Sequence, residues 1–246
     1  KVAVADNSTC AEANKHYPSL GYVMGAPVIT QLPNGRFVVI FGNGDTAGTS
    51  APQTSSLFII DIAAPFNTAF SKVISMGTGA GLSAVEVLPN SIGQGVKAYA
   101  GDLSGNLWHF DLSSSNPANW QKDYLLFQAS YTVNNAPVYQ PIFAAPTIGY
   151  NLKTNKVMVY FGTGKYYDTG DNVASATPIH SLYAIADVGL AASPVARSTL
   201  KAKGIITGGS ATVPTRTEDS SKTPDWNTNN GWYLDLPSTG ERITTT

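Results

Sequence analysis

Two carboxylates lie three positions apart in the segment YYDTGD (166–171), where they could support chemistry. Asp168 and Asp171 are close enough in sequence to bind a cation or to place two carboxylates beside a substrate. The same Asp-Thr-Gly run is also a good turn, because an aspartate side chain can accept hydrogen bonds from the backbone that follows it. We therefore favour a turn, and a loose calcium or substrate contact is the alternative.

The common catalytic and metal-binding patterns are missing from the sequence. The Asp-Thr-Gly run of aspartic proteases occurs once here, with the wrong flanking residues, and no GxSxG elbow is present. No two of the histidines His16, His109 and His180 share a metal-ligand spacing such as HxH or HExxH. The single cysteine, Cys10, excludes CxxC motifs and a disulfide within this chain. We therefore predict that the protein is not an enzyme, has no catalytic or cofactor-binding residues and holds no metal.

Aromatic residues in polar loops are the candidate binding surface, because packing is less obligatory there. These residues are Tyr166, Tyr167 and Trp226. Four aspartates recur at one place in the sequence pattern, after an apolar strand, and we predict that they cap the turn that follows. They are Asp61, Asp111, Asp187 and Asp235.

The composition narrows the classes of partner. Only 13% of the residues are charged and the formal net charge is -1, so the chain lacks the basic field that binds nucleic acid. Many Gly (23), Pro (15) and Tyr (12) residues suit short strands, many turns and a place outside the cytoplasm. No stretch is long and apolar enough to span a membrane. In a secreted protein the lone Cys10 indicates a partner elsewhere in a longer polypeptide, and a solitary reduced thiol is the alternative.

Three passages of the sequence repeat the same strand pattern. Each has a short apolar strand, a strand ending in a Gly-rich turn and a strand closing on Asp. The copies are 26–32, 36–44 and 56–62; 81–88, 96–105 and 106–112; and 145–152, 156–164 and 181–187. Outer strands at 70–76 and 120–127 complete the first two units, and 231–236 reads as a fourth, partial copy. About four antiparallel strands per unit indicate propeller blades.

The chain is therefore predicted to be all-β, a partial, modified β-propeller of antiparallel four-stranded blades with long loop insertions. We predict that residues 1–246 form one partial propeller domain, which the resemblance described below places in the C-terminal part of a longer protein, and that 189–228 is a long polar loop insertion. The glycines of FGNG (41–44), AGDLSG (100–105) and FGTG (161–164) serve sharp turns. No helix follows them, which argues against nucleotide-binding loops.

One segment of the sequence resembles a motif of a known protein family. Residues 96–113 read VKAYAGDLSGNLWHFDLS, which looks like the YAGDLxGNLWxFDL hallmark of the PilY/PilC family of pilus-associated proteins. Its structural motif residues here are Asp102, Gly105, Asn106, Trp108 and Asp111. Other pieces follow in the family's order, including QPIFAAP (140–146), VMVYFGTGKYYDTGD (157–171) and GWYLDLPSTGER (231–242). The resemblance covers roughly residues 20–190 and 230–242.

The resemblance implies a modified β-propeller at or near the tip of a type IV pilus, in the C-terminal part of a much longer secreted protein. It implies a cell-surface, outer-membrane-associated location and a role in pilus extension and retraction, attachment to host cells or abiotic surfaces, and twitching motility. The implied partners are minor pilins, the pilus tip and an adhesive surface ligand. Nucleic acid is not among them.

The family commonly carries a calcium loop before the YAGD strand, and this chain departs from it. The matching residues are 88–97, where Asn90, Ser91 and Gln94 offer neutral oxygens and no carboxylate remains between Glu86 and Asp102. Neutral oxygens cannot balance the charge of Ca²⁺ as aspartates do. Lys97 adds an opposing charge. We therefore predict that this degenerate loop binds no calcium.

Two other functions fit a propeller with such repeats. One is a quinoprotein-like enzyme, which would need acidic ligands near the ring centre, and the sequence shows no such cluster. The other is a scaffold propeller for outer-membrane assembly, which uses similar repeats. The function that we favour is the one that the resemblance implies, a binding module of the pilus. The low charge, the polar loops and the missing catalytic pattern fit a module that works by binding.

Overall fold

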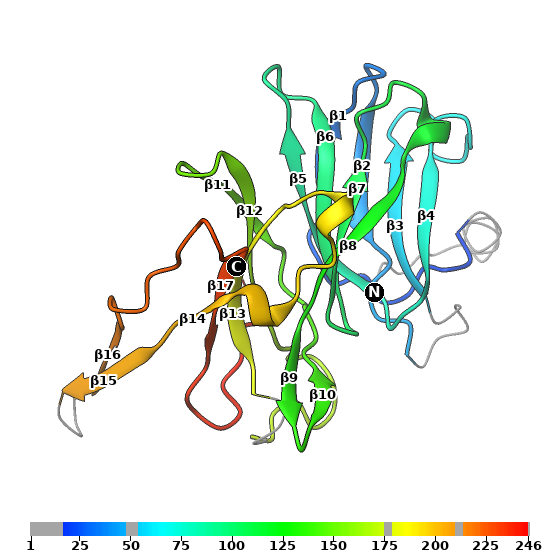
Figure 1. Cartoon of the computed structure of the whole chain (residues 1–246). Helices are drawn as coiled ribbons and strands as arrows, with labels where there is room; N and C mark the ends of the chain where they lie inside the picture. Colours follow the sequence, from blue (N-terminus) through cyan, green and yellow to red (C-terminus); the bar gives the residue numbers. More distant parts are fainter. Residues whose placement is uncertain (1–16, 48–53, 175–178, 210–213, 246) are drawn as a thin grey trace.

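Short antiparallel strands make up most of the computed structural model, which describes residues 17–47, 54–174, 179–209 and 214–245. In the described part of the chain the strands form three large sheets, the blades, and two separate hairpins. The sheets stand side by side in chain order (Figure 1). None of the described residues belongs to a helix long and apolar enough to cross a membrane. Cys10 and His16 lie outside the described residues.

Blades 1 and 2 are four-stranded antiparallel sheets in which each strand pairs with the next in sequence. Blade 1 consists of β1 (Val28–Gln31), β2 (Phe37–Gly42), β3 (Thr54–Asp61) and β4 (Lys72–Thr78). Blade 2 consists of β5 (Leu82–Pro89), β6 (Gly95–Asp102), β7 (Asn106–Asp111) and β8 (Gln121–Gln128). The hairpin β9 (Ser130–Val133) and β10 (Ala136–Tyr139) follows. These sheets confirm the predicted four-stranded antiparallel blades.

The structure of blade 3 shows that the prediction of a fourth, partial copy at 231–236 was wrong. It contains β11 (Thr147–Asn151), β12 (Lys156–Gly162), β13 (Ser181–Ala186) and β17 (Gly231–Asp235). The segment 231–236 is therefore not the start of a fourth blade, because β17 pairs with β13 as the outer strand of the third. A two-residue strand, β14 (Lys201–Ala202), pairs parallel to β17 and gives the sheet a fifth member. The sequence pattern correctly predicted a strand at 231–236, but it did not identify β13 as the strand with which it pairs.

Blade 2 packs against a hydrophobic core on each of its two faces. Alternate residues along β6 face opposite ways. Ala98 and Ala100 join the core shared with blade 1, while Tyr99 joins the core shared with blade 3. On β7, Phe110 faces the first of these cores and Leu107 faces the second. Burial of whole side chains between sheets supplies most of the stabilisation in such a stack.

Each blade has a fully buried polar residue at the end of its second strand. Asn43, Asp102 and Thr163 each come directly after a glycine, at the ends of β2, β6 and β12. The side-chain oxygen of Asn43 accepts hydrogen bonds from Ser56 N of the same blade (2.9 Å) and Leu82 N of the next (2.8 Å). We call these three the junction residues, because their side chains join neighbouring strands.

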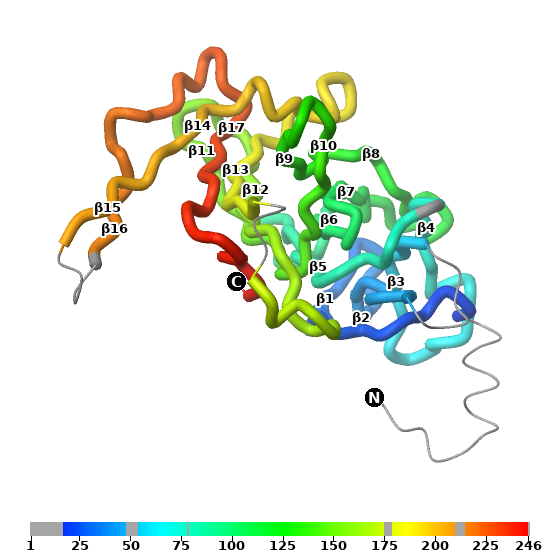
Figure 2. The backbone as a smooth tube through the Cα atoms, turned by 90° about the horizontal axis from the view of Figure 1, so that it is seen from below, coloured from blue at the N-terminus to red at the C-terminus, as the bar shows by residue number. Residues whose placement is uncertain are grey.

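Residues 187–230 leave blade 3 after β13 and return as β17. They include the predicted insertion 189–228, which carries the short 3₁₀ helices η2 (Leu190–Ala192) and η3 (Arg197–Thr199). Its hairpin, β15 (Ile205–Gly209) and β16 (Pro214–Glu218), projects away from the three sheets (Figure 2).

One arginine fastens the insertion to blade 3. Arg197 Nη2 donates to both carboxylate oxygens of Asp235 (2.7 and 2.9 Å), and its guanidinium lies 3.9 Å from the ring centroid of Tyr233. Arg197 Nη1 donates to Ser130 O at 2.9 Å, which ties the same point to the β9–β10 hairpin. The base of the insertion is therefore held firmly although its tip projects.

Candidate binding groove

The hallmark string folds into a closed turn around one carboxylate. Asp102 is fully buried, and its Oδ1 accepts hydrogen bonds from the backbone N–H groups of Ser104 and Asn106, both at 2.9 Å. Its Oδ2 accepts from Asn106 Nδ2 and Trp108 Nε1, both at 2.9 Å, and from Ser55 Oγ of blade 1 at 3.2 Å. The Asp, Asn and Trp of the motif are therefore tied together by one hydrogen-bond network.

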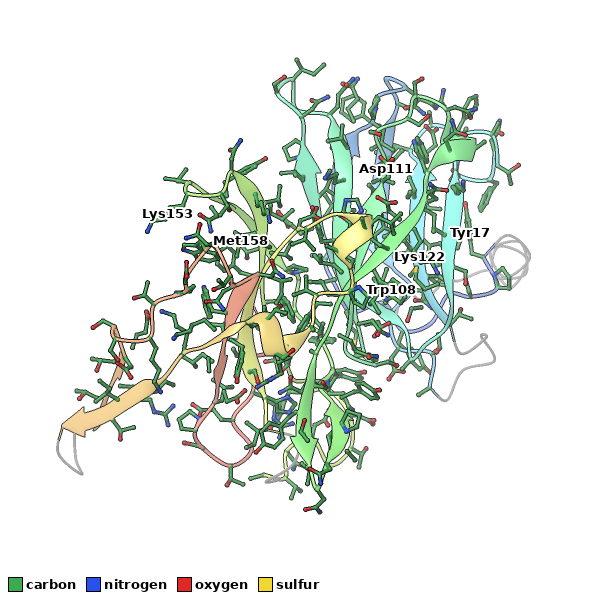
Figure 3. All side chains as sticks on the ribbon, in the orientation of Figure 1. Tyr17, Trp108, Asp111, Lys122, Lys153 and Met158 are labelled. Atoms are coloured by element: carbon green, nitrogen blue, oxygen red, sulfur yellow. The ribbon has the colours of Figure 1, made fainter. Side chains whose placement is uncertain are left out.

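The glycine and the second aspartate of the motif have separate local roles. Gly105 has φ +85°, and a Cβ there would stand 2.8 Å from Ala129 O and 2.9 Å from Gln140 O, so only glycine fits. Asp111 lies at the other end of β7, where its Oδ1 accepts from Ser113 N at 2.9 Å. Figure 3 labels Asp111 together with Trp108 and Lys122 on blade 2. The motif thus builds the blade and presents no catalytic arrangement.

Three of the four recurring aspartates cap the turn after their strand. The bonds are Ala64 N to Asp61 (2.7 Å), Ser113 N to Asp111 (2.9 Å) and Gly189 N to Asp187 (3.1 Å). The fourth, Asp235, is bound by Arg197 from the insertion. Asp61 also forms an ion pair with Arg36. The Nε and Nη2 atoms of Arg36 donate hydrogen bonds to the two carboxylate oxygens of Asp61, at 2.5 and 2.8 Å.

The loop that matches the family's calcium site closes on itself. Asn90 Oδ1 accepts from Ile92 N (3.1 Å) and Gln94 N (3.0 Å), and Asn90 Nδ2 donates to Gln94 Oε1 (3.3 Å). The oxygens that a cation would need are thus already used by the protein, and Ser91 supplies no charge. The donor set does not fit Ca²⁺, which prefers several carboxylates.

Lys97 plays a different part from the one expected. Its Nζ lies 3.6 Å from Asp187 Oδ2, across the interface with blade 3, so its charge is paired there. The 88–97 loop is therefore unsuited to calcium because it lacks carboxylates and because the amides of Asn90 and Gln94 bond to each other.

We propose that the 88–97 loop binds no calcium. Titration calorimetry of the purified protein with Ca²⁺ is expected to give no micromolar site that depends on Asn90, because no carboxylate is present to balance the ion. Asn90→Asp tests whether one charge begins to restore affinity, and Ser114→Asp, in another exposed turn, is the matched control. A micromolar site that vanishes in Asn90→Ala would contradict the proposal.

A buried polar cluster joins blade 2 to blade 3. Asp187 accepts hydrogen bonds from the hydroxyls of Tyr99 (2.7 Å) and Tyr124 (2.5 Å). Burial alone would raise the pKa of Asp187, but these two hydrogen bonds hold the pKa below its ordinary value, so the carboxylate stays ionised. Burial and the same carboxylate raise the pKa of both tyrosines.

His109 lies inside this cluster. Only 2% of it is exposed, and its ring stacks on Tyr124 with centroids 4.4 Å apart. Nδ1 is 3.2 Å from Asp123 Oδ2 and Nε2 is 4.0 Å from Asp187 Oδ2, but neither contact has hydrogen-bond geometry. Burial lowers the pKa of His109, which keeps the ring neutral near pH 7. Its role is packing between blades. Among the described residues no group of three or more His, Cys, Asp or Glu side chains could hold a metal.

The YYDTGD segment forms a turn just beyond β12. Asp171 Oδ2 accepts from Tyr167 N (3.1 Å) and Asp168 N (3.0 Å), and Lys165 Nζ lies 3.2 Å from the same oxygen. Burial would raise the pKa of Asp171, but those N–H groups and Lys165 hold it below its ordinary value. Asp168 also lies beside Lys165, at 3.4 Å. The two carboxylates therefore share one cation from the protein itself.

A groove of about 420 Å³ opens between this turn and the chain after β17. Its polar lining comes from Tyr166, Asp171 and Asn172 on one side and from Glu241, Arg242 and Thr244 on the other. This volume is within the range of small-ligand sites. The groove is the candidate functional site.

The structure separates the three aromatic candidates. Tyr166 is 59% exposed and lines the groove. Tyr167 is half-buried, packs on Phe143 and donates a hydrogen bond to Asp45 Oδ2 at 3.1 Å. Trp226 packs against the core cluster of Met158 at the opposite end of β12. The three residues therefore form no common surface.

Sequence reasoning did not identify Arg242 as a groove residue. Arg242 Nη1 donates to Lys165 O (3.0 Å), and Nε donates to Gly240 O (3.1 Å). These bonds hold the guanidinium beside Tyr166, 5.8 Å from the ring centroid. In the sequence, Arg242 was marked only as the last residue of the family-like segment GWYLDLPSTGER, and that segment gives no information about a groove.

The comparisons with known proteins agree with one another. A model of the PilY1 β-propeller domain matches residues 2–207. The chain is 34% identical over 188 residues to the type IV pilus biogenesis factor PilY1 of Pseudomonas aeruginosa strain PAO1, which covers 69% of this chain and 16% of that protein. It is 32% identical over 251 residues to a PilY1 homologue of Xylella fastidiosa strain Temecula1, which covers 90% of this chain and 16% of that protein.

A solved structure extends the likeness to the fold. The crystal structure of the Pseudomonas aeruginosa PilY1 C-terminal domain superimposes with a TM-score of 0.74 at 27% sequence identity. The superposition covers 94% of this chain and 54% of that domain. The chain thus spans about a sixth of the length of the curated relatives that it matches.

Proposed function

The chain belongs to the PilY1 β-propeller family, and from this we propose that it acts in type IV pilus biogenesis, by binding and not by catalysis. The observation that supports this most strongly is the family match over residues 2–207, together with relatives that are themselves pilus biogenesis factors. Asp61, Asp111 and Asp235 are used in caps and ion pairs within the fold, which favours a scaffold that displays loops.

We further propose that the protein is at the cell surface, at or near the pilus tip and associated with the outer membrane. There it would contact minor pilins, influence extension and retraction, and support attachment to host cells or abiotic surfaces and twitching motility. Rigid blades with polar loops suit this role, because a fixed scaffold lowers the entropic cost of ordering a binding surface.

Deleting the gene that encodes this chain is expected to remove most surface pili. Electron microscopy would count the fibres, and the diameter of twitching zones and the number of attached cells would be measured in parallel. Complementation with the unaltered gene should restore all three. Immunogold label is expected at fibre ends.

Unchanged pili, twitching and attachment after deletion would contradict the proposed function. Label along the envelope, with none at fibre ends, would favour the alternative of an outer-membrane assembly scaffold.

A further inference from the structure

The groove between the YYDTGD turn and the chain after β17 contains one guanidinium without an ion-pair partner. The two carboxylates that line the groove each contact a cation of the protein, since Asp171 pairs at 3.2 Å with Lys165, which it shares with Asp168, and Glu241 pairs with Arg216. The partner Arg216 also helps to hold the pKa of Glu241 below its ordinary value, against the effect of burial. Arg242, by contrast, forms an ion pair with no carboxylate in the described residues.

The guanidinium of Arg242 is fixed in place and still has free donors. Its Nε and Nη1 each donate to a backbone carbonyl, which sets the plane of the group. A guanidinium has five N–H donors in a rigid fork, and Nη2 has no acceptor among the described residues. A planar group positioned in this way suits a carboxylate, which it can bind with two parallel hydrogen bonds.

The aromatic ring of Tyr166 lies next to the guanidinium of Arg242. Tyr166 is 59% exposed, although its neighbour Tyr167 is packed and hydrogen-bonded. The face of an aromatic ring carries partial negative charge, so it attracts the polarised C–H bonds on one face of a pyranose ring. Asn172 and Thr244 line the same groove and add groups that can hydrogen-bond to hydroxyls.

From this arrangement we infer that the groove binds an acidic saccharide, a sugar unit with one carboxylate for Arg242 and one apolar face for Tyr166. One carboxylate is balanced by the one guanidinium that has no ion-pair partner, whereas the second negative charge of a phosphate dianion would have no cation of its own beside Asp171 and Glu241. Apart from Ala174, Gly240 and the tyrosine ring, the residues that line the groove have polar or charged side chains, which favours a ligand with hydroxyl groups over an apolar peptide side chain. The inference deepens the proposed function, on which it rests, by giving the adhesive ligand a chemical class.

The test compares sialyllactose with lactose on the purified protein, because the two probes differ by the acidic sugar. Digalacturonate is a second acidic probe. Saturation-transfer NMR and titration calorimetry are expected to show at least one acidic probe binding tenfold or more tightly than lactose. Tyr166→Ala is expected to weaken that binding about tenfold, and Arg242→Gln at least as much. Tyr150→Ala is the matched control, because Tyr150 is 56% exposed on β11, outside the groove, and should leave binding unchanged.

Equal binding of lactose and both acidic probes, or no binding of any, would overturn the inference. So would equal losses in Tyr166→Ala and Tyr150→Ala. An N-acetylated dipeptide with a free carboxylate that binds as tightly as the acidic sugars would assign the groove to a peptide end instead. Since these measurements use no pili, they can fail while the deletion phenotype stands, and the reverse is also true.

Discussion

Asp102→Ala is expected to lower the free energy of unfolding by about 4 kcal/mol. The substitution removes the acceptor of five hydrogen bonds, including those from Trp108 Nε1 and from Ser55 Oγ of the neighbouring blade. Each buried donor left without an acceptor costs about 1–3 kcal/mol. Because domains are stable by about 5–15 kcal/mol, such a loss would leave a visibly weakened fold. Urea denaturation followed by tryptophan fluorescence measures it.

Asp111→Ala is the matched control for this prediction. Asp111 belongs to the same hallmark string, but its side chain caps the turn through Ser113 N and is only half-buried. Its removal should cost about 1 kcal/mol or less. Asp102→Asn is expected to fall between the two, because an amide keeps the shape but replaces one acceptor by a donor. Equal losses for Asp102→Ala and Asp111→Ala would show that the buried network is not what holds the turn.

The sequence pattern predicted the blades well because period and burial are local properties. Every strand expected in blades 1 and 2 is present within a few residues of its predicted bounds. Blade 2 packs on both faces, and the apolar run at 98–101 in its second strand, β6, is easy to recognise. The turn role of Asp111 could be predicted for the same reason, since a cap involves a backbone group only two residues away.

Features that depend on distant parts of the chain could not be predicted in this way. The strand at 231–236 was recognisable, but its partner β13 is set by pairing across the whole insertion. Asp102 was predicted to be a structural residue of the hallmark string, but its bond to blade 1 was not, and Asn43 and Thr163 were not identified. The side chains of Asn43 and Asp102 bind groups from two blades, which a local sequence pattern does not reveal. The groove combines two segments far apart in sequence, and nothing near Arg242 reveals that Tyr166 lies beside it.

Stability is expected to fall as the pH is lowered from about 6.5 to about 4, and His180 is the main cause. His180 is 7% exposed and lies against Thr163 Oγ1, at 3.3 Å from its Nδ1. Burial, with a smaller contribution from the positive charge of Arg242, lowers its pKa from 6.5 to about 4. Above pH 6.5 the ring is neutral in both states. Below that pH the unfolded chain binds a proton that the folded chain does not, which favours unfolding.

The expected loss from His180 is about 3 kcal/mol once the pH has fallen through its folded pKa. His109 acts in the same direction, because burial lowers its pKa as well. Glu86 acts in the opposite direction, because burial raises its pKa and the folded chain then gains a proton more readily. Asp61 and Asp187, whose pKa values are lowered, contribute their losses below about pH 4, outside this window.

His180→Asn isolates the histidine effect, because the amide keeps a polar atom near the position of Nδ1 and does not titrate. Denaturation midpoints measured every half pH unit should fall less steeply in the variant than in the unaltered protein between pH 6.5 and 4. The readout is the slope, so a uniform loss of stability in the variant does not obscure it. Tyr150→Ala should keep the full slope. If His180→Asn keeps it too, burial beside Thr163 and Arg242 is not the origin of the acid sensitivity, and His109, the other buried histidine among the described residues, becomes the group to replace.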